Sequence, residues 1–227
     1  LFFCAVIFGA LLTGCNPNKA GTNQMAATVV YVIDGDTIKV KVNHRLETVR
    51  MLLIDTPETD HPSKGEQPYG RQAKRMTQKL LPPGQQVTLV FGGEKRDKYG
   101  RLLAHVFADG KNVEEALLAE GLARVAYVYE ADARESDDRK AEEEAEKKHL
   151  NIWAVPGYVQ RDGFHPEVIA RIAKYVASKN SEVYHPIGCP DAKQILWANR
   201  VYFQSEKEAI ASGRHRSHSN CWDSLGK

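Results

Sequence analysis

The stretch VVYVIDGDTIKVKV, residues 29–42, alternates β-branched and polar residues around the interruption Asp34-Gly35-Asp36. Such period-two alternation is typical of strands with one buried face, and the interruption suits a turn or a bulge. Two further runs have the same character, LETVRMLLI at 46–54 and QQVTLVFGG at 85–93. RLLAHVFADGKNV, residues 101–113, predicts two short strands around the turn pair Asp109-Gly110. This part of the chain therefore predicts a β-rich domain.

Helical segments are interspersed with these strands. YGRQAKRMTQKLL at 69–81 has helical spacing and stops before two prolines, and VEEALLAEGLA at 113–123 predicts a short helix. A third helix is expected from about Asp132 to Lys148, and its dense charge of both signs is typical of a solvated face. Together the elements predict an α+β fold, an OB-type five-stranded Greek-key β-barrel with about three helices, over residues 28–157.

The character of the sequence changes after Trp153-Ala154-Val155-Pro156-Gly157, so we expect a domain boundary near residue 158. Residues 166–179 predict an amphipathic helix, and a small Cys/His-containing module follows to residue 227. A chain of 227 residues is long enough for one good core and a small second module. Its net charge of +2 is too small to indicate nucleic-acid binding, so a site for a polyanion needs local clusters of Lys and Arg.

The first residues predict export. Residues 1–12 form an apolar run that is short for a membrane span, which favours the core of a signal peptide. Leu12-Thr13-Gly14-Cys15 resembles the bacterial lipoprotein signal, which implies acylation of Cys15, a lipid anchor on the outer face of the cell membrane and a mature chain that starts there. The alternative is a secretory signal cut elsewhere. Residues 16–27 are polar and predict a flexible tether between the anchor and the fold.

The candidate functional residues lie in three clusters. These are Asp34 to Thr37, then Arg50 with Asp55 to Glu58, and then Asp97 to Arg101. They supply carboxylates for a hard cation, a further carboxylate that can move a proton, and two arginines for a phosphate. This combination is typical of metal-assisted phosphodiester hydrolysis. Each cluster also has an ordinary structural explanation, because Asp-Gly pairs are common in hairpins and a strand arginine is usually a surface residue.

With these clusters, the chain resembles the staphylococcal nuclease (thermonuclease) family from about Thr28 to Trp153. The matching stretches are VIDGDTIKV, VRMLLIDTPETDHPSKGEQPYG, RDKYGRLLAHVFADGK, EGLARVAYVYE and KKHLNIWA. The resemblance implies a monomeric, calcium-dependent nuclease that hydrolyses DNA and RNA with little sugar discrimination and leaves 3′-phosphate ends. Two alternative functions are a catalytically inactive OB module that only binds nucleic acid, and a surface-attachment protein whose tail has the main function.

The resemblance also assigns roles to single residues. It implies that Asp36 and Asp55 bind calcium through carboxylates and Thr56 through its backbone carbonyl. Arg50 and Arg101 would hold the scissile phosphate, and Glu58 would act as a general base or orient the group that does. The substrate would be contacted by a set of basic and aromatic residues, namely Lys98, Tyr99, Tyr127, Tyr129 and Lys64. Tyrosine faces suit stacking on any base, whereas ordinary packing is the competing explanation for Tyr127 and Tyr129.

The tail carries two short His/Cys pairs, His185 with Cys189 and His218 with Cys221. These four residues would suit a tetrahedral zinc site. A Cys189–Cys221 disulfide is the natural alternative in an exported protein, and two free thiols are the third possibility. The stretch from Tyr184 to Gly213 also resembles the small metal-binding module of the Ada DNA-repair protein, although His218-x-x-Cys221 replaces its usual Cys-x-x-Cys end.

Overall fold

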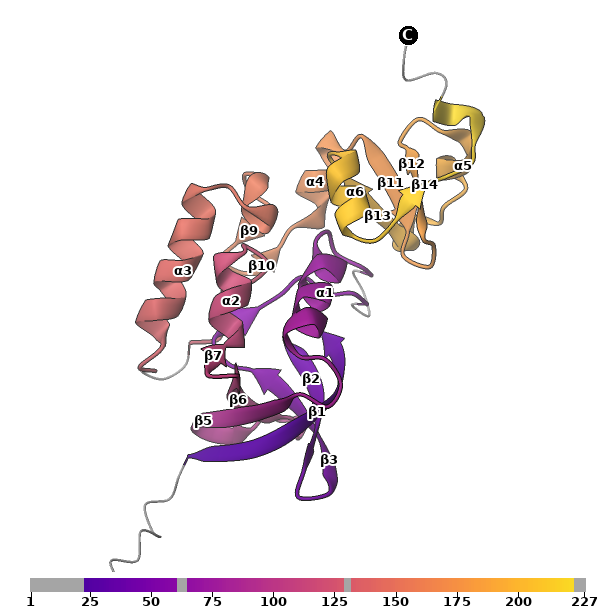
Figure 1. Cartoon of the computed structure of the whole chain (residues 1–227). Coiled ribbons are helices and arrows are strands. Elements are labelled where there is room, and N and C mark those ends of the chain that lie inside the picture. Colours follow the sequence, from indigo (N-terminus) through magenta and orange to yellow (C-terminus); the bar gives the residue numbers. More distant parts are fainter. Residues whose placement is uncertain (1–22, 61–64, 129–131, 223–227) are drawn as a thin grey trace, which may run out of the picture.

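The computed structural model describes residues 23–60, 65–128 and 132–222. Five strands form the barrel: β1 (Gln24–Asp34), β2 (Thr37–Val42), β3 (Arg45–Met51), β5 (Gln86–Arg96) and β6 (Leu102–Ala108). Their hydrogen-bonded order is β3-β2-β1-β5-β6, and a parallel pairing of β3 with β6 closes the sheet (Figure 1). The predicted α+β fold on a five-stranded OB-type barrel is confirmed.

The barrel closes because alternate residues of each strand point inward. Ile38, Val40, Val49, Leu89 and Val106 are fully buried in its interior. Burying one such aliphatic side chain stabilises a fold by about 1.5–3 kcal/mol, so this inner face accounts for much of the barrel's stability.

Three helices accompany the barrel, as predicted: α1 (Gly70–Leu80), α2 (Val113–Ala119) and α3 (Glu135–Lys147). The α1 and α2 helices lie at one end of the barrel, and α3 packs on α2 from outside (Figure 1). Two short strands, β4 (Ile54–Asp55) and β8 (Arg124–Val125), pair with each other, and β7 (Lys111–Asn112) pairs antiparallel with the end of β6.

The chain after the barrel forms a hairpin, a short helix and a second sheet. The hairpin is β9 (Val159–Gln160) with β10 (Gly163–Phe164), and α4 (Pro166–Ile172) follows. The sheet has the order β13-β11-β12-β14, and its strands are β11 (Tyr175–Ser178), β12 (Val183–Pro186), β13 (Arg200–Phe203) and β14 (His215–Arg216). The helices α5 (Pro190–Lys193) and α6 (Glu206–Ala211) and the short 3-10 segments Asn151–Ala154, Trp197–Asn199 and Asn220–Trp222 complete the elements.

Two sequence predictions need correction. The helix predicted over 166–179 ends at Ile172, because Ala173 is extended and residues 175–178 pair as a strand with both β12 and β13. This pairing buries Val176 and Ala177 between neighbours, which a continued helix would not do. The tether predicted for residues 16–27 is also too long, since β1 begins at Gln24 and pairs there with β5.

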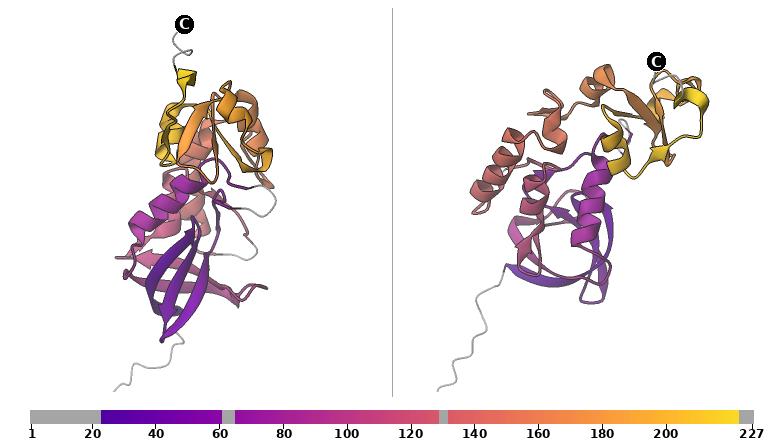
Figure 2. Two further views of the ribbon diagram at one scale, coloured as in Figure 1. Left: turned by 90° about the vertical axis from the view of Figure 1, so that its right-hand side faces the viewer. Right: turned by 45° about the horizontal axis from the view of Figure 1, so that its top comes forward.

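The segment that follows residue 157 packs against the barrel domain. Tyr158, Phe164 and Ile169 are buried in the same hydrophobic cluster as the barrel interior, while a smaller cluster lies within the second sheet. The segment after residue 157 and the barrel domain therefore lie in direct contact. The second sheet lies beyond the end of α1 (Figure 2). Within the described ranges, no helix combines the length and the apolar character needed to cross a membrane. Cys15, the predicted lipidation site, lies outside the described residues.

Candidate functional site

Asp36 lies at the turn between β1 and β2 and is held by Thr56. The Asp36 Oδ2 atom accepts hydrogen bonds from the backbone N–H and from Oγ1 of Thr56, both at 3.0 Å, and Oδ1 accepts one from the Thr37 hydroxyl at 2.9 Å. The neighbouring Gly35 makes this contact sterically feasible, since a Cβ there would lie 2.6 Å from Thr56 Oγ1. The turn and the segment after β4 are thus in contact, as the sequence predicted.

Arg50 joins the two predicted calcium carboxylates. It stands opposite Thr37 in the β2–β3 pairing, and its guanidinium nitrogens lie 3.0 Å from Asp36 Oδ2 and 3.6 Å from Asp55 Oδ1. Burial disfavours its charge, but the carboxylates of Asp36 and Asp55 outweigh that effect and raise the pKa of Arg50. Three predicted site residues, from two of the sequence clusters, therefore meet at one place.

Arg124 is a member of this group that the sequence did not reveal. In the β4–β8 pairing it stands opposite Asp55, and its Nη2 and Nε atoms lie 2.9 and 3.0 Å from Asp55 Oδ2. Burial raises the pKa of Asp55 while the charge of Arg124 opposes that rise. A strand of two residues has no visible period, so the pairing that brings Arg124 here leaves no pattern in the sequence.

Glu58 forms a hydrogen-bonded pair with a second carboxyl group, Asp34. Burial, the hydrogen-bonded Asp34 and the negative charge of Asp36 together raise the pKa of Glu58 to about 8. Asp34 is held in turn by the backbone N–H groups of Gly35 and Thr59, at 2.9 and 3.1 Å. Such a pair titrates as a unit, so the raised pKa belongs to the two carboxyl groups together. Asp34 was quoted in the first sequence cluster but had no assigned role.

The backbone of Glu58 is fixed by Gln67 on the far side of the loop. The Glu58 N–H donates to Gln67 Oε1, and the Gln67 N–H donates to the Glu58 carbonyl, each at 2.9 Å. Gly70 then allows the chain to pass close by, since a Cβ at that position would lie 2.6 Å from the Glu58 carbonyl oxygen. Glu58 is therefore held by its backbone as well as by its carboxyl group.

Arg101 is held by its own turn. Its Nε lies 2.6 Å from Asp97 Oδ2, and the other Asp97 oxygen accepts the backbone N–H of Arg101 at 2.9 Å. The parallel register sets Arg50 against Leu103, two residues beyond Arg101. Alternation therefore places Arg50 and Arg101 on the same face of the closed sheet.

The predicted substrate contacts are mostly exposed. Tyr99 is 73% exposed, and Lys98 Nζ and Arg101 Cζ lie 5.1 and 5.6 Å from its ring centroid. Tyr127 is 51% exposed and its ring centroid lies 5.5 Å from Arg50 Cζ. Tyr129 and Lys64 lie outside the described residues.

The donors at this end of the barrel fit a hard cation. Asp36 and Asp55 offer carboxylate oxygens within reach of one guanidinium, and oxygen is the ligand type that calcium prefers. The negative charge of Asp36 also raises the pKa of Asp34, Asp55 and Glu58, so the carboxyl groups repel one another. A divalent cation would relieve that repulsion.

In the tail, Cys189 and Cys221 form a disulfide, which is one of the predicted alternatives. The ligand atoms of His185, Cys189 and Asp191 lie within 4.8 Å of one another. His218 is not part of that group, and both cysteine sulfurs are bonded to each other, so the predicted four-residue zinc site is not assembled in this state.

Comparison with known proteins gives a consistent result. The family model described as "Staphylococcal nuclease homologue" matches residues 48–155. The chain is 49% identical over 155 residues to endonuclease YncB of Bacillus subtilis, covering 65% of this chain and 74% of that protein. It is 43% identical over 151 residues to the thermonuclease of Staphylococcus intermedius, covering 65% and 89% respectively. The SPbeta prophage-derived endonuclease YokF of B. subtilis is 50% identical over 139 residues, which cover 61% of this chain but 47% of that longer protein.

Proposed function

The chain belongs to the staphylococcal nuclease family, and we propose that it is a calcium-dependent phosphodiesterase that hydrolyses DNA and RNA with little sequence or sugar specificity. The observation that carries the proposal is the meeting of Asp36, Arg50 and Asp55 beside the Asp34–Glu58 pair. Nuclease relatives support the reaction class, and the oxygen donors support calcium.

Asp36, Asp55 and the backbone carbonyl of Thr56 would hold the ion. When bound, calcium would neutralise charge on the phosphate and help to orient the attacking water. Asp36 and Asp55 are already fixed by Thr56 and Arg124, so little side-chain ordering is left for the binding step.

Glu58 takes the proton of the attacking water in this proposal. A general base works best when its pKa lies near the operating pH, and the pairing with Asp34 supports that condition. Arg50 and Arg101 grip the phosphate oxygens and stabilise the charge that grows as water attacks in line. The 5′-oxygen then leaves, so the products end in 3′-phosphate.

Substrate contacts extend to both sides of the reacting phosphate. Lys98 and Tyr99 contact a terminal phosphate, Tyr127 and Tyr129 line the nucleotide pocket, and Lys64 attracts the polyanion. The exposure of Tyr99 and Tyr127 supports stacking on bases, which is tolerant of sequence.

For location we propose an exported, monomeric protein, lipid-anchored at Cys15 on the outer face of the membrane or secreted. The apolar run before Cys15 supports export. The Cys189–Cys221 disulfide agrees with an oxidising compartment. Calcium is abundant outside the cell, which suits the proposed cofactor.

An inactive nucleic-acid-binding module is the competing function. A binding surface needs exposed cations and aromatic rings, but it has no use for carboxyl groups whose pKa values are raised by burial and by one another's charge. The geometry therefore favours the enzyme. A surface-attachment role for the tail is compatible with a nuclease and would be an addition to it.

The test is cleavage of single-stranded DNA and of RNA by the purified chain, with calcium and then with a chelator. Cleavage in calcium, its loss on chelation and its return when calcium is restored are expected, with 3′-phosphate ends in the products. Binding of the same oligonucleotides without any cleavage at saturating calcium would instead support the inactive module.

A further inference from the structure

A buried ion pair joins the C-terminal module, defined here as residues 174–222, to the loop after Glu58. Arg214 Nη1 lies 2.9 Å from Glu66 Oε1, and Arg214 Nη2 lies 2.7 Å from Glu66 Oε2. The two side chains are 0% and 3% exposed. A buried bidentate pair adds little net stability, because both charges lose their hydration, but it fixes relative orientation closely.

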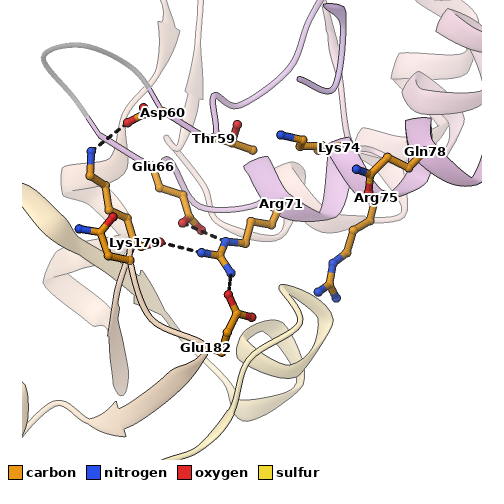
Figure 3. Close-up of a pocket in the computed structure, with 10 residues that line it drawn as sticks. Thr59, Asp60, Glu66, Arg71, Lys74, Arg75, Gln78, Lys179 and Glu182 are labelled. Atoms are coloured by element: carbon orange, nitrogen blue, oxygen red, sulfur yellow. Dashed lines mark hydrogen bonds and ion pairs between the residues drawn. The ribbon is translucent and has the colours of Figure 1, made fainter. Parts of the chain in front are cut away.

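Arg71 of α1 makes a second bridge around the same carboxylate. Its Nε lies 3.1 Å from Glu66 Oε2, its Nη1 lies 2.9 Å from Glu182 of the module, and its Nη2 donates to the Lys179 carbonyl at 2.7 Å. The module also reaches the loop directly, since Lys179 Nζ lies 2.8 Å from Asp60 Oδ1 (Figure 3). The loop is thus held by the module at both of its described ends.

The residue that follows Glu66 is the one that fixes Glu58. Gln67 exchanges two hydrogen bonds of 2.9 Å with the Glu58 backbone. A hydrogen bond from Tyr158 to the Pro68 carbonyl, at 2.6 Å, anchors the next residue. A continuous path of short contacts therefore runs from Arg214 through Glu66 and Gln67 to Glu58.

We propose that the C-terminal module positions Glu58 for catalysis, and that Glu66 and Arg214 are positioning residues of the nuclease site. The proposal rests on the proposed function, in which Glu58 accepts the proton. Loss of orientation at the proton acceptor slows the chemical step, because misplacement of about 1 Å can cost about 100-fold in rate. Substrate and calcium binding use other residues and should be nearly unaffected.

The variants Arg214→Gln and Glu66→Gln test the pair in the full chain with single-stranded DNA. A fall in kcat of about 10- to 100-fold is expected, with KM and the half-saturating calcium concentration within about twofold of wild type. Arg214→Lys, which keeps one charged contact but not the fork, should recover part of the rate. Arg71→Gln removes a different contact of the same Glu66 carboxylate. Because the Arg71 side chain is 20% exposed, this variant should fold and can be measured even if Arg214→Gln does not fold.

Arg216→Gln is the matched control. Arg216 pairs with Glu206 at 2.6 Å inside the module, so its loss removes a module ion pair without touching the loop after Glu58. Its kcat should stay at the wild-type value. A kcat in Arg214→Gln, Glu66→Gln and Arg71→Gln equal to that of this control would overturn the proposal.

A double-mutant comparison separates positioning from a general effect. In the Glu58→Gln background, Arg214→Gln should cause almost no further loss of the residual rate, because the group it positions is absent. The same fold-loss in both backgrounds would contradict positioning through Glu58. Failure of the proposed function looks different, because the wild-type chain itself would then show no calcium-dependent cleavage.

Discussion

At the scale of single residues, the site is a balance between crowded carboxyl groups and a few fixed cations. Arg50 lies between Asp36 and Asp55, and Arg124 holds the other oxygen of Asp55. The charges of these arginines keep the carboxylates close together despite their mutual repulsion. The orientation of both proposed calcium ligands is therefore fixed by the protein's own side chains.

Asp36→Ala should raise the calcium requirement. The change removes one of two carboxylate ligands, so the half-saturating calcium concentration should rise at least about 10-fold, with partial activity regained at high calcium. A calcium titration of the cleavage rate measures it. Asp109→Ala, at the exposed turn that Asp109 forms with Gly110, is the control and should leave the titration unchanged. An unaltered requirement in Asp36→Ala would remove Asp36 from the ion's ligands.

Gly70→Ala should lower kcat by displacing Glu58. The new Cβ would lie 2.6 Å from the Glu58 carbonyl oxygen, and backbone atoms on both sides would have to move apart. We expect about a 10-fold fall in kcat with little change in KM. Gly188→Ala, which meets no atom within 4 Å, is the control. A wild-type kcat in Gly70→Ala would mean that the backbone position of Glu58 is not critical.

At the scale of secondary structure, α2 and α3 bury carboxyl groups that the catalytic proposal does not use. Glu114 accepts the Val106 N–H at 2.9 Å and is fully buried, which raises its pKa well above the ordinary range. Asp138 of α3 is buried too, and burial together with the negative charges of Glu115 and Asp132 raises its pKa to about 7. Desolvation is thus the main electrostatic cost of packing α3 on α2.

This cost predicts a pH-dependent stability. Between pH 3.8 and about 7, the folded state keeps Asp138 protonated while the unfolded chain has released the proton, so the free energy of unfolding falls as pH rises. The variant Asp138→Asn lacks this titration. Its advantage over wild type in the free energy of unfolding should therefore grow by about 2–3 kcal/mol from pH 5 to pH 8. Urea unfolding at both pH values measures it. A difference in the free energy of unfolding between Asp138→Asn and wild type that is the same at pH 5 and at pH 8 would contradict a raised pKa of Asp138.

The elements themselves were largely predictable because their causes are local. The alternation of apolar and polar residues over 29–42 and 46–54 matches the burial pattern of the barrel strands. Asp109-Gly110 forms the predicted turn. The helix predicted over 166–179 was wrong beyond Ile172, because pairing with distant strands overrides a weak helical pattern. Asp36, Arg50 and Asp55 were predicted together, whereas Arg124 reaches Asp55 through a two-residue strand that has no pattern.

At the scale of the whole molecule, the module and the barrel domain meet through charges far apart in sequence. Glu66 and Arg214 are separated by 148 residues, and neither belongs to a motif that would pair them. Such contacts cannot be read from periodicity or spacing, so the placement of the module needed the structure. Its consequence is that the stability of the module and the activity of the barrel domain are linked.

Reduction of the disulfide should expose that link. The Cys189–Cys221 bridge has a sequence separation of 32 residues, and opening a loop of that size costs about 3–4 kcal/mol by chain entropy. Amide exchange in β11 to β14 should accelerate on reduction more than exchange in the barrel strands, and kcat should fall in parallel. Cys189→Ser/Cys221→Ser, which reductant cannot alter further, is the control. Unchanged exchange in the second sheet would contradict a stabilising bridge.

The most direct measurement is the cleavage rate of Glu58→Gln on single-stranded DNA at saturating calcium, with nucleotide affinity measured on the same samples. A loss of about 100-fold or more in kcat is expected, because proton transfer by a positioned base contributes at least that factor, and the affinity should be almost unchanged. A rate close to wild type at saturating calcium would contradict this expectation.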